Sequence, residues 1–306
     1  MNIFTAFNDG YVFPTRVMLK SLILNNPDPL RIFVFYSSLK QESIDAIKGL
    51  EEKGRVSFSF QKVDDTFLDG IEIPKQFSKE TYYRLLAHRL FAEEIERVLW
   101  LDGDIIIKGS LAEFYNQDFK GKLYAAVEDA SKEITEEKHI QLRMPPDSKY
   151  VNTGVLLFNL REMRKELKDQ EILQYLTDNQ EILSLADQDV LNGLLHDRIL
   201  AVDSPRWYNF SRWYITEENK RMVYENARLI HYCGQKKPWE KKYSGLGADL
   251  WWKYALLTGP EYRKLYPVFL FSQTLSKIKK ALRKLARIML PTSVYARLNS
   301  ICRSGK

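Results

Sequence analysis

The sequence lacks the features of a secreted or membrane-spanning chain. It holds only two cysteines, Cys233 and Cys302, whose spacing fits neither a metal site nor a disulfide framework. This scarcity predicts a reducing compartment. The chain begins with Met1-Asn2-Ile3-Phe4 and goes directly into a strand-like run, so we expect no secretory leader. No apolar run reaches the roughly 20 residues that a membrane helix needs. We therefore expect a cytoplasmic protein, with peripheral attachment to the inner face of the cell membrane left open.

Acidic side chains are missing from the last part of the chain. The formal net charge is +6, but residues 262–306 hold eleven Lys or Arg and no Asp or Glu. The first 261 residues therefore carry 35 basic and 40 acidic side chains. This change in composition predicts two parts, a catalytic-size domain over 1–260 and a basic tail over 261–306.

The glycine-rich motifs of the common nucleotide-binding folds are absent as well. The first turn, Asn8-Asp9-Gly10-Tyr11, offers one glycine where a dinucleotide-binding turn has G-x-G-x-x-G, and no P-loop pattern occurs. The sequence therefore argues against a dinucleotide-dependent oxidoreductase.

The chain instead alternates strand-like and helix-like segments. We expect strands over 2–7, 32–36, 56–63, 98–101, 123–127 and 151–159, and helices over about 14–24, 43–52, 82–95 and 190–195. This order is typical of an α/β fold built on a mainly parallel sheet, in which ligands bind beyond the carboxyl ends of the strands. The polar stretch 134–149, with two adjacent prolines, is predicted to be a loop over that site.

The stretch Val98-Leu99-Trp100-Leu101-Asp102-Gly103-Asp104 combines a buried strand with two carboxylates. On an extended chain, Asp102 and Asp104 point to the same side, with alpha carbons roughly 6.6 Å apart. Ionised aspartates are costly near a core unless a cation or hydrogen bonds accompany them. Paired carboxylates suit a hard divalent ion such as Mn²⁺ or Mg²⁺. A D-x-D triplet is also common in solvated turns, so this motif needs support from the rest of the chain.

Two later segments offer that support. Asp187-Gln188-Asp189 opens a predicted helix, and a capping role would explain one of its polar residues but not Gln188. His231 is followed by Gly234, Lys236 and Lys237, a composition that suits phosphate. A single histidine can equally be a core residue, so its role stays open on this evidence.

Taken together, these segments resemble glycosyltransferase family 8, particularly its bacterial lipooligosaccharide galactosyltransferases. The resemblance covers about residues 1–260 and rests on motifs in the family's order. They are Thr5-Ala6 with Asn8-Asp9-Gly10-Tyr11, Thr81-Tyr82-Tyr83-Arg84-Leu85, Leu101-Asp102-Gly103-Asp104, Asn152-Thr153-Gly154-Val155, Asp187-Gln188-Asp189-Val190-Leu191-Asn192-Gly193, and His231-Tyr232-Cys233-Gly234 with Lys237-Pro238-Trp239.

The resemblance implies a GT-A fold and a retaining enzyme that uses Mn²⁺ and a UDP-sugar. Carried over by position, it assigns the metal to Asp102, Asp104 and His231. It assigns the nucleotide to Ala6, Asn8, Tyr11, Asp102, Gly103, Asp104, Gly234 and Lys237. It assigns the donor sugar to Arg84, Asn152, Gly154, Asp187 and Gln188, and catalytic roles to Gln188, Asp187 and Asp129. At position 8 the chain departs from the family, which often has Asp where Asn8 stands, although an amide oxygen can still accept a hydrogen bond from uracil.

The activity expected from this resemblance is transfer of a hexose, galactose first and glucose second, to a lipid-linked saccharide or a glycoprotein. Gln188 would stabilise positive charge at the reacting sugar through its carbonyl oxygen, because an amide is a poor nucleophile. The alternative is a catalytically silent scaffold that binds sugar nucleotides. Nucleic acid is not an expected partner.

The basic tail has the pattern of an amphipathic helix. Leu275, Ile278, Leu282, Leu285 and Met289 recur at steps of three and four residues, which gives one apolar stripe. Basic residues occupy other faces, among them Lys277, Lys280, Arg283, Lys284 and Arg287. Such a helix is typical of attachment to an anionic membrane surface. Packing against the catalytic domain or a dimer partner remains the alternative.

Overall fold

The computed structural model describes residues 1–129, 132–202, 207–240, 243 and 245–289. The chain divides into two compact units, residues 1–235 and 236–306. The change in charge that predicted a boundary at residue 260 coincides with the start of helix α11 (Pro260–Met289). The predicted extent of the catalytic domain, 1–260, stays a prediction.

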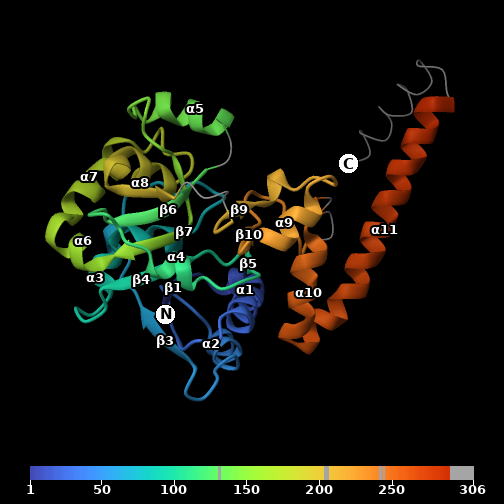
Figure 1. Cartoon of the computed structure of the whole chain (residues 1–306), viewed down its shortest axis with the longest axis horizontal. Helices are drawn as coiled ribbons and strands as arrows, with labels where there is room; N and C mark the ends of the chain where they lie inside the picture. The colour runs from blue at the N-terminus through green and yellow to red at the C-terminus, as the bar shows by residue number, and fades with distance from the viewer. Residues whose placement is uncertain (130–131, 203–206, 241–242, 244, 290–306) are drawn as a thin grey trace. The chain divides into compact units, whose positions relative to one another are not determined.

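The first unit is organised around a seven-stranded sheet (Figure 1). Its spatial order is β3 (Val56–Lys62), β2 (Leu30–Tyr36), β1 (Asn2–Ala6), β4 (Arg97–Leu101), β7 (Val151–Asn159), β6 (Tyr124–Glu128) and β8 (Ile199–Val202). Strand β7 runs antiparallel to both β4 and β6, whereas the other neighbouring pairs are parallel. The expected α/β fold with a mixed, mainly parallel sheet is confirmed.

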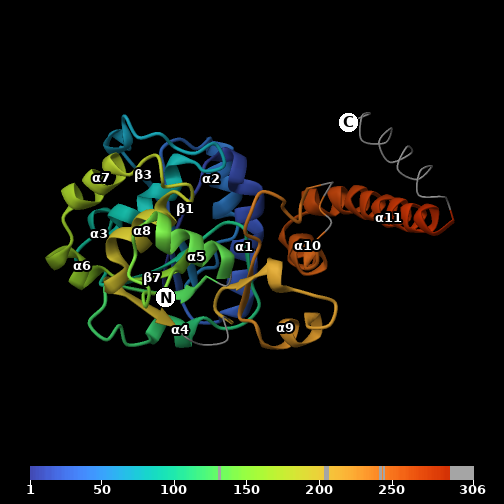
Figure 2. The same cartoon turned by 90° about the horizontal axis from the view of Figure 1, so that it is seen from above.

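Both faces of the sheet are covered because its central strands are apolar on both sides. Ile3 and Leu99 pack into one core with α1 (Val12–Asn25) and α2 (Gln41–Lys48). The neighbouring residues Phe4 and Trp100 point the other way and form a second core. That face is covered by α3 (Ala87–Leu90), α6 (Leu160–Glu166), α7 (Asp169–Asp178) and α8 (Asp187–Leu195), as Figures 1 and 2 show. Alternation along each strand thus places helices on both faces.

A smaller three-stranded sheet follows the D-x-D turn. Its order is β5 (Ile105–Ile107), β10 (Leu229–His231) and β9 (Phe210–Ser211), with β5 antiparallel to β10. The short helices α4 (Ala112–Asn116) and α9 (Lys220–Asn226) also belong to this unit. Its described residues include 3-10 segments over 9–11, 66–68, 79–86, 196–198 and 212–214.

The second unit contains α10 (Ala248–Thr258) and α11, which lie side by side over the first turns of α11 (Figures 1 and 2). Aromatic rings pack between these two helices. The ring centroid of Trp252 lies 4.9 Å from that of Phe269 and 5.4 Å from that of Tyr266. Among the residues the structure describes, no helix is both long enough and apolar enough to cross a bilayer.

Two expected elements differ from the structure. The predicted helix over 82–95 is instead a 3-10 segment over Lys79–Leu86 followed by the single turn of α3. Residues are buried all around the segment, including Glu80 and Arg84, so tertiary contacts rather than a one-sided apolar pattern decide its conformation. The predicted loop over 134–149 is wrong in its first half, because α5 (Lys132–Gln141) is helical. Its polar composition reflects charged helix faces rather than the absence of structure.

Candidate active site

The site lies at one edge of the large sheet, where β1, β4 and β6 end and β7 begins. Because β7 is antiparallel, its first residues lie beside the last residues of its neighbours. Leu101 is opposite Val155, and the backbone N–H of Asp102 donates to the Gly154 carbonyl at 3.0 Å. On the other side, the N–H of Asp129 donates to the Tyr150 carbonyl at 2.8 Å. The predicted residues Asp102, Asp129 and Gly154 are thereby brought to one place.

Pairing in the small sheet brings the distant histidine to the D-x-D turn. His231, the last residue of β10, is opposite Ile105, the first residue of β5. The N–H of Tyr232 donates to the Asp104 carbonyl at 3.0 Å. The backbone thus fixes His231 next to Asp104.

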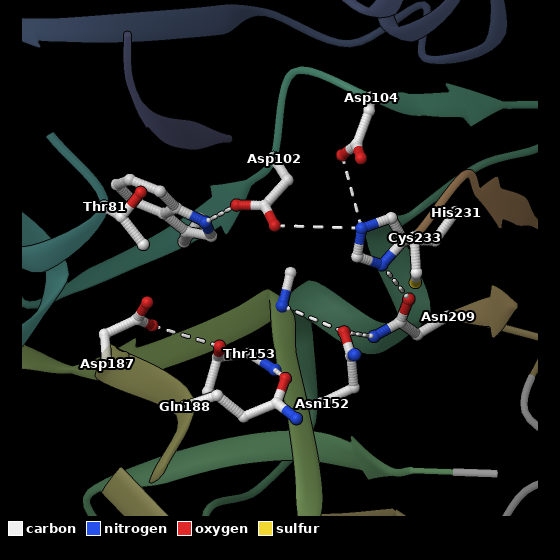
Figure 3. A network of polar contacts seen from close by, with 12 residues as sticks. Thr81, Asp102, Asp104, Asn152, Thr153, Asp187, Gln188, Asn209, His231 and Cys233 are labelled. Carbon is white, nitrogen blue, oxygen red and sulfur yellow. Dashed lines mark hydrogen bonds and ion pairs between the residues drawn. The ribbon is translucent and has the colours of Figure 1, made fainter. Parts of the chain in front are cut away.

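The imidazole of His231 lies between the two aspartates (Figure 3). Its Nε2 is 3.2 Å from Asp104 Oδ1 and 3.7 Å from Asp102 Oδ2. One ligand atom from each residue lies within 4.8 Å of the other two. Asp104 and His231 are buried, and Asp102 is partly exposed. Two carboxylates and an imidazole that converge with one open side fit a divalent ion that also takes oxygen ligands from a substrate.

A hydrogen bond on the far side of the ring orients this imidazole. Nδ1 of His231 is 3.1 Å from Asn209 Oδ1, and Asn209 Nδ2 donates to Asn152 Oδ1 at 2.9 Å. Because the Asn209 amide nitrogen is used on Asn152, its oxygen accepts from Nδ1–H. In the neutral imidazole, the lone pair of Nε2 then faces the carboxylates, which is the usual arrangement around a metal-binding histidine.

Burial and the neighbouring groups act on the pKa of His231 in opposite directions. Burial lowers the pKa, whereas Cys233 and the Asp104 carboxylate raise it, and the net pKa lies well above the ordinary value. A metal ion must displace that proton, because only the neutral imidazole can be a ligand.

Two glycines make room for this arrangement. A side chain at Gly154 would place its Cβ 2.2 Å from His231 Cε1 and 2.9 Å from Asp102 Oδ2. A Cβ at Gly103 would lie 2.4 Å from Thr15 Oγ1 and 2.9 Å from the Tyr11 ring. Gly154, predicted as a sugar-binding residue, thus also has a packing role beside the cluster of Asp102, Asp104 and His231. Tyr11, predicted to stack on uracil, lies against the D-x-D turn.

Arg84 is buried and forms ion pairs with two of the acidic residues. Its guanidinium is 3.0 Å from Asp102 Oδ1 and 3.1 Å from Asp187 Oδ2, and it stacks 4.0 Å from the centre of the Trp100 ring. Asp102 Oδ1 also accepts from Trp100 Nε1 at 2.6 Å. One oxygen of Asp102 is therefore held by the protein, and the other faces His231.

Asp187 does not cap its helix, contrary to the simplest explanation of its position. The cap residue of α8 is Ala186, which has a φ of 53° and no side-chain acceptor for the first N–H groups of the helix. The Asp187 carboxylate instead accepts from Thr153 Oγ1 at 3.1 Å. Burial raises the pKa of Asp187 to about 7, although Arg84 acts to lower it.

Gln188 is held by contacts from both sides. Its Oε1 accepts from the Thr153 N–H at 3.2 Å, and its Nε2 donates to Tyr150 Oη at 3.2 Å and to Asp129 Oδ2 at 3.5 Å. The same Asp129 oxygen accepts from Asn152 Nδ2 at 3.2 Å. Asp129 thus joins two amides, which gives it a positioning role whatever its part in catalysis.

The predicted nucleotide residues are divided between the two units. Ala6 ends β1, and Asn8 caps the turn that follows by accepting from the Gly10 N–H at 3.0 Å. Gly234 has a φ of 85° and belongs to the first unit, whereas Lys237 belongs to the second. The expected contacts of Asn8, Gly234 and Lys237 with a nucleotide stay predictions.

Sequence reasoning missed Asn209, Tyr150 and Lys138. A single polar residue beyond the motifs gives no pattern to follow. Asn209 contacts His231, Tyr150 contacts Gln188, and Lys138 contacts Asp189.

Comparison with known proteins decides the family. The profile described as Glycosyl transferase family 8 matches residues 2–243. The chain belongs to this family. Its membership confirms the predicted enzyme class, a UDP-hexose-dependent retaining glycosyltransferase.

Two of the similar curated proteins are named as lipopolysaccharide glycosyltransferases. The lipopolysaccharide 1,2-glucosyltransferase of Escherichia coli K12 is 26% identical, over 79% of this chain and 73% of that protein. The lipopolysaccharide 1,3-galactosyltransferase of Salmonella typhimurium is 27% identical, over 78% and 72%.

Solved structures agree on the fold. The galactosyltransferase LgtC, determined in complex with donor and acceptor sugar analogues, gives a TM-score of 0.74. The match covers 87% of this chain and 100% of LgtC, at 23% identity. The predicted GT-A fold is confirmed.

Proposed function

We propose that this enzyme transfers galactose or glucose from the UDP-sugar to a saccharide acceptor, with a divalent ion bound by Asp102, Asp104 and His231. The observation that carries the proposal is the convergence of these three side chains within 4.8 Å at the substrate edge of the sheet. Mn²⁺ is the expected ion and Mg²⁺ the alternative. Such an ion supplies positive charge beside the diphosphate that leaves the sugar.

The polar residues beside the cluster suit the transfer step. The bond between the anomeric carbon and the phosphate oxygen breaks, and the acceptor oxygen bonds to the same face of the sugar. The acceptor's proton goes to the departing phosphate oxygen. Gln188 would stabilise the positive charge at the ring through its Oε1, which the Thr153 N–H already orients. Asp187 would hold sugar hydroxyls, as would Arg84, Asn152 and Gly154.

The names of the relatives support the choice of substrates. The two curated proteins described above are named for glucose and galactose, and both act on lipopolysaccharide. Galactose remains our first choice of donor, glucose the second, and a lipid-linked saccharide the favoured acceptor over a glycoprotein.

Release of UDP from a panel of UDP-sugars with Mn²⁺ tests this proposal. We expect release from UDP-galactose or UDP-glucose, loss on addition of EDTA, and no release by Asp102→Ala. An exposed aspartate far from the site, Asp178, gives the matched control Asp178→Ala, which should keep full activity. Donor binding without any release of UDP would favour the silent scaffold instead.

We also propose that the end of α11 attaches the enzyme to the anionic inner face of the cell membrane. Leu282 and Met289 are 60% and 78% exposed, and they share one face with Leu275, Ile278 and Leu285. The basic residues predicted to contact lipid all fall within α11, but their side chains lie outside the described residues: Lys277, Lys280, Arg283, Lys284 and Arg287. Each basic side chain near an anionic leaflet contributes about 1 kcal/mol.

Co-sedimentation of the full chain with vesicles tests this attachment. Binding to vesicles with anionic lipid at low salt, weakened by salt and absent for neutral vesicles, is the expected result. A dimer that forms without lipid, and a chain that ignores anionic vesicles, would point to the alternative of a protein partner.

A further inference from the structure

A buried lysine lies behind the proposed catalytic amide, and neither the metal cluster nor the sugar residues account for it. Lys138, on α5, is 3% exposed. Its Nζ donates to Asp189 Oδ2, Ser184 Oγ and Gln141 Oε1, each at 2.7 Å. All three ammonium protons therefore have acceptors. A lysine is seldom buried unless it is paired, so its position calls for a reason.

The partner of Lys138 is the aspartate that follows Gln188. Asp189 is fully buried, and besides Lys138 it accepts from the Leu185 N–H at 2.8 Å. Its other oxygen, Oδ1, accepts from the hydroxyl of Tyr150 at 2.6 Å. All three of these contacts are donors, so both oxygens of the Asp189 carboxylate act as acceptors.

The hydroxyl of Tyr150 links Asp189 to the side-chain amide of Gln188. Its proton is committed to Asp189, so toward Gln188 it can only accept, and it does so from Nε2 at 3.2 Å. On the opposite side, the Thr153 N–H can only donate, and it does so to Gln188 Oε1. The two contacts together allow one orientation of the amide, with its oxygen toward Thr153.

We propose that Lys138 is a positioning residue that fixes the orientation of the Gln188 amide through Asp189 and Tyr150. This inference rests on the proposed function, in which the Gln188 oxygen faces the reacting sugar. Without the ammonium, the buried Asp189 carboxylate loses its charged donor, so its position relative to the Tyr150 hydroxyl is no longer fixed. The Tyr150 proton could then turn to Gln188. Only the Thr153 N–H and the longer 3.5 Å contact with Asp129 Oδ2 would still orient the amide, so its direction would be less firmly fixed.

The kinetic test uses Tyr150→Phe and Lys138→Met. Both should lower kcat for UDP release about 10- to 100-fold, the range for losing a group that orients a reacting side chain. The KM for the UDP-sugar should change less than threefold, because neither side chain is placed among the donor-binding residues. An unchanged kcat in a folded Tyr150→Phe protein would overturn the proposal.

Two matched controls separate this role from general packing. Tyr124→Phe removes another buried hydroxyl, one that has no hydrogen-bond partner within the described part of the chain. Ser184→Ala removes one acceptor of Lys138 but leaves the path to Gln188 intact. Both should keep kcat within twofold. If kcat falls as far in Tyr124→Phe or Ser184→Ala as in Tyr150→Phe, removal of any buried polar group slows the enzyme, and the proposal is overturned.

A measurement without turnover separates this inference from the proposed function. The side-chain amide signal of Gln188 in ¹⁵N–¹H spectra is assigned by its loss in Gln188→Ala. It should shift in Tyr150→Phe and Lys138→Met and stay unchanged in Tyr124→Phe. If the signal moves as expected while the unmodified enzyme releases no UDP, the positioning stands and the proposed function fails. If Lys138→Met does not fold, Tyr150→Phe alone decides, and an unmoved signal there overturns the inference.

Discussion

The candidate site at the edge of the large sheet and the last turns of α11 differ in which side chains they bury and which they expose. At the sheet edge, several charged residues are buried and paired within the chain: Arg84 with Asp187, Lys138 with Asp189, and His231 with Asp104. Along the end of α11, apolar residues are exposed instead, such as Leu282 and Leu285. Buried charge that is paired within the chain indicates an internal function, whereas an exposed apolar stripe indicates a partner outside it. The predictions below test each side of this contrast.

The largest effect is expected from the metal cluster. Asp102→Ala removes one carboxylate ligand and leaves part of Arg84 unpaired. Transfer activity should fall on the order of 10³-fold, because charge stabilisation by such an ion amounts to several kcal/mol. UDP release at saturating Mn²⁺ checks this. If Asp102→Ala keeps activity within tenfold of the unmodified enzyme, the cluster is not required for catalysis.

The next effect concerns stability. Arg84→Met leaves the buried Asp187 without its cation, so the free energy of unfolding should fall by about 3–5 kcal/mol. Urea denaturation measures this loss. The control is Arg221→Met, which breaks an exposed pair with Glu225 and should cost less than about 1 kcal/mol. Equal losses of unfolding free energy in Arg84→Met and Arg221→Met would show that the burial of an ion pair does not set its contribution to stability.

A smaller effect is expected where the cluster depends on close packing. Gly154→Ala would push a methyl group into His231 and Asp102, so Mn²⁺ affinity should fall at least tenfold. Isothermal titration with Mn²⁺ measures it. Gly49→Ala is the matched control, because a Cβ there meets its nearest atom at 3.5 Å, an ordinary contact. Unchanged affinity in Gly154→Ala would mean that the ligands can shift at little cost.

The smallest effect on the enzyme itself is expected from α11. Leu282→Ser with Leu285→Ser should weaken binding to anionic vesicles while changing the free energy of unfolding by less than about 0.5 kcal/mol, because both side chains are exposed. Leu257→Ser, at an exposed position of α10, is the control and should keep vesicle binding. If the double variant binds vesicles as well as Leu257→Ser and the unmodified protein do, the stripe does not face lipid.

Strong local patterns predicted much of this molecule. The strand 151–159 matches β7 residue for residue, and the D-x-D turn follows a buried strand as expected. The segments at 82–95 and 134–149 were less predictable. In the first, tertiary packing favours a tight 3-10 winding over an α-helix, and in the second, a polar helix has the composition of a loop. Local propensity is weak where packing decides.

The sequence by itself determined the family, the fold class and most of the residues at the site, because motifs and hydrophobic alternation are encoded over a few neighbouring positions. Only the tertiary structure decided which partners they have. The antiparallel direction of β7, the pairing of β10 with β5, and the path from Lys138 to Gln188 all join residues far apart in the chain. No local pattern records such contacts, since they arise only when strands and helices pack and every buried polar group must find a partner.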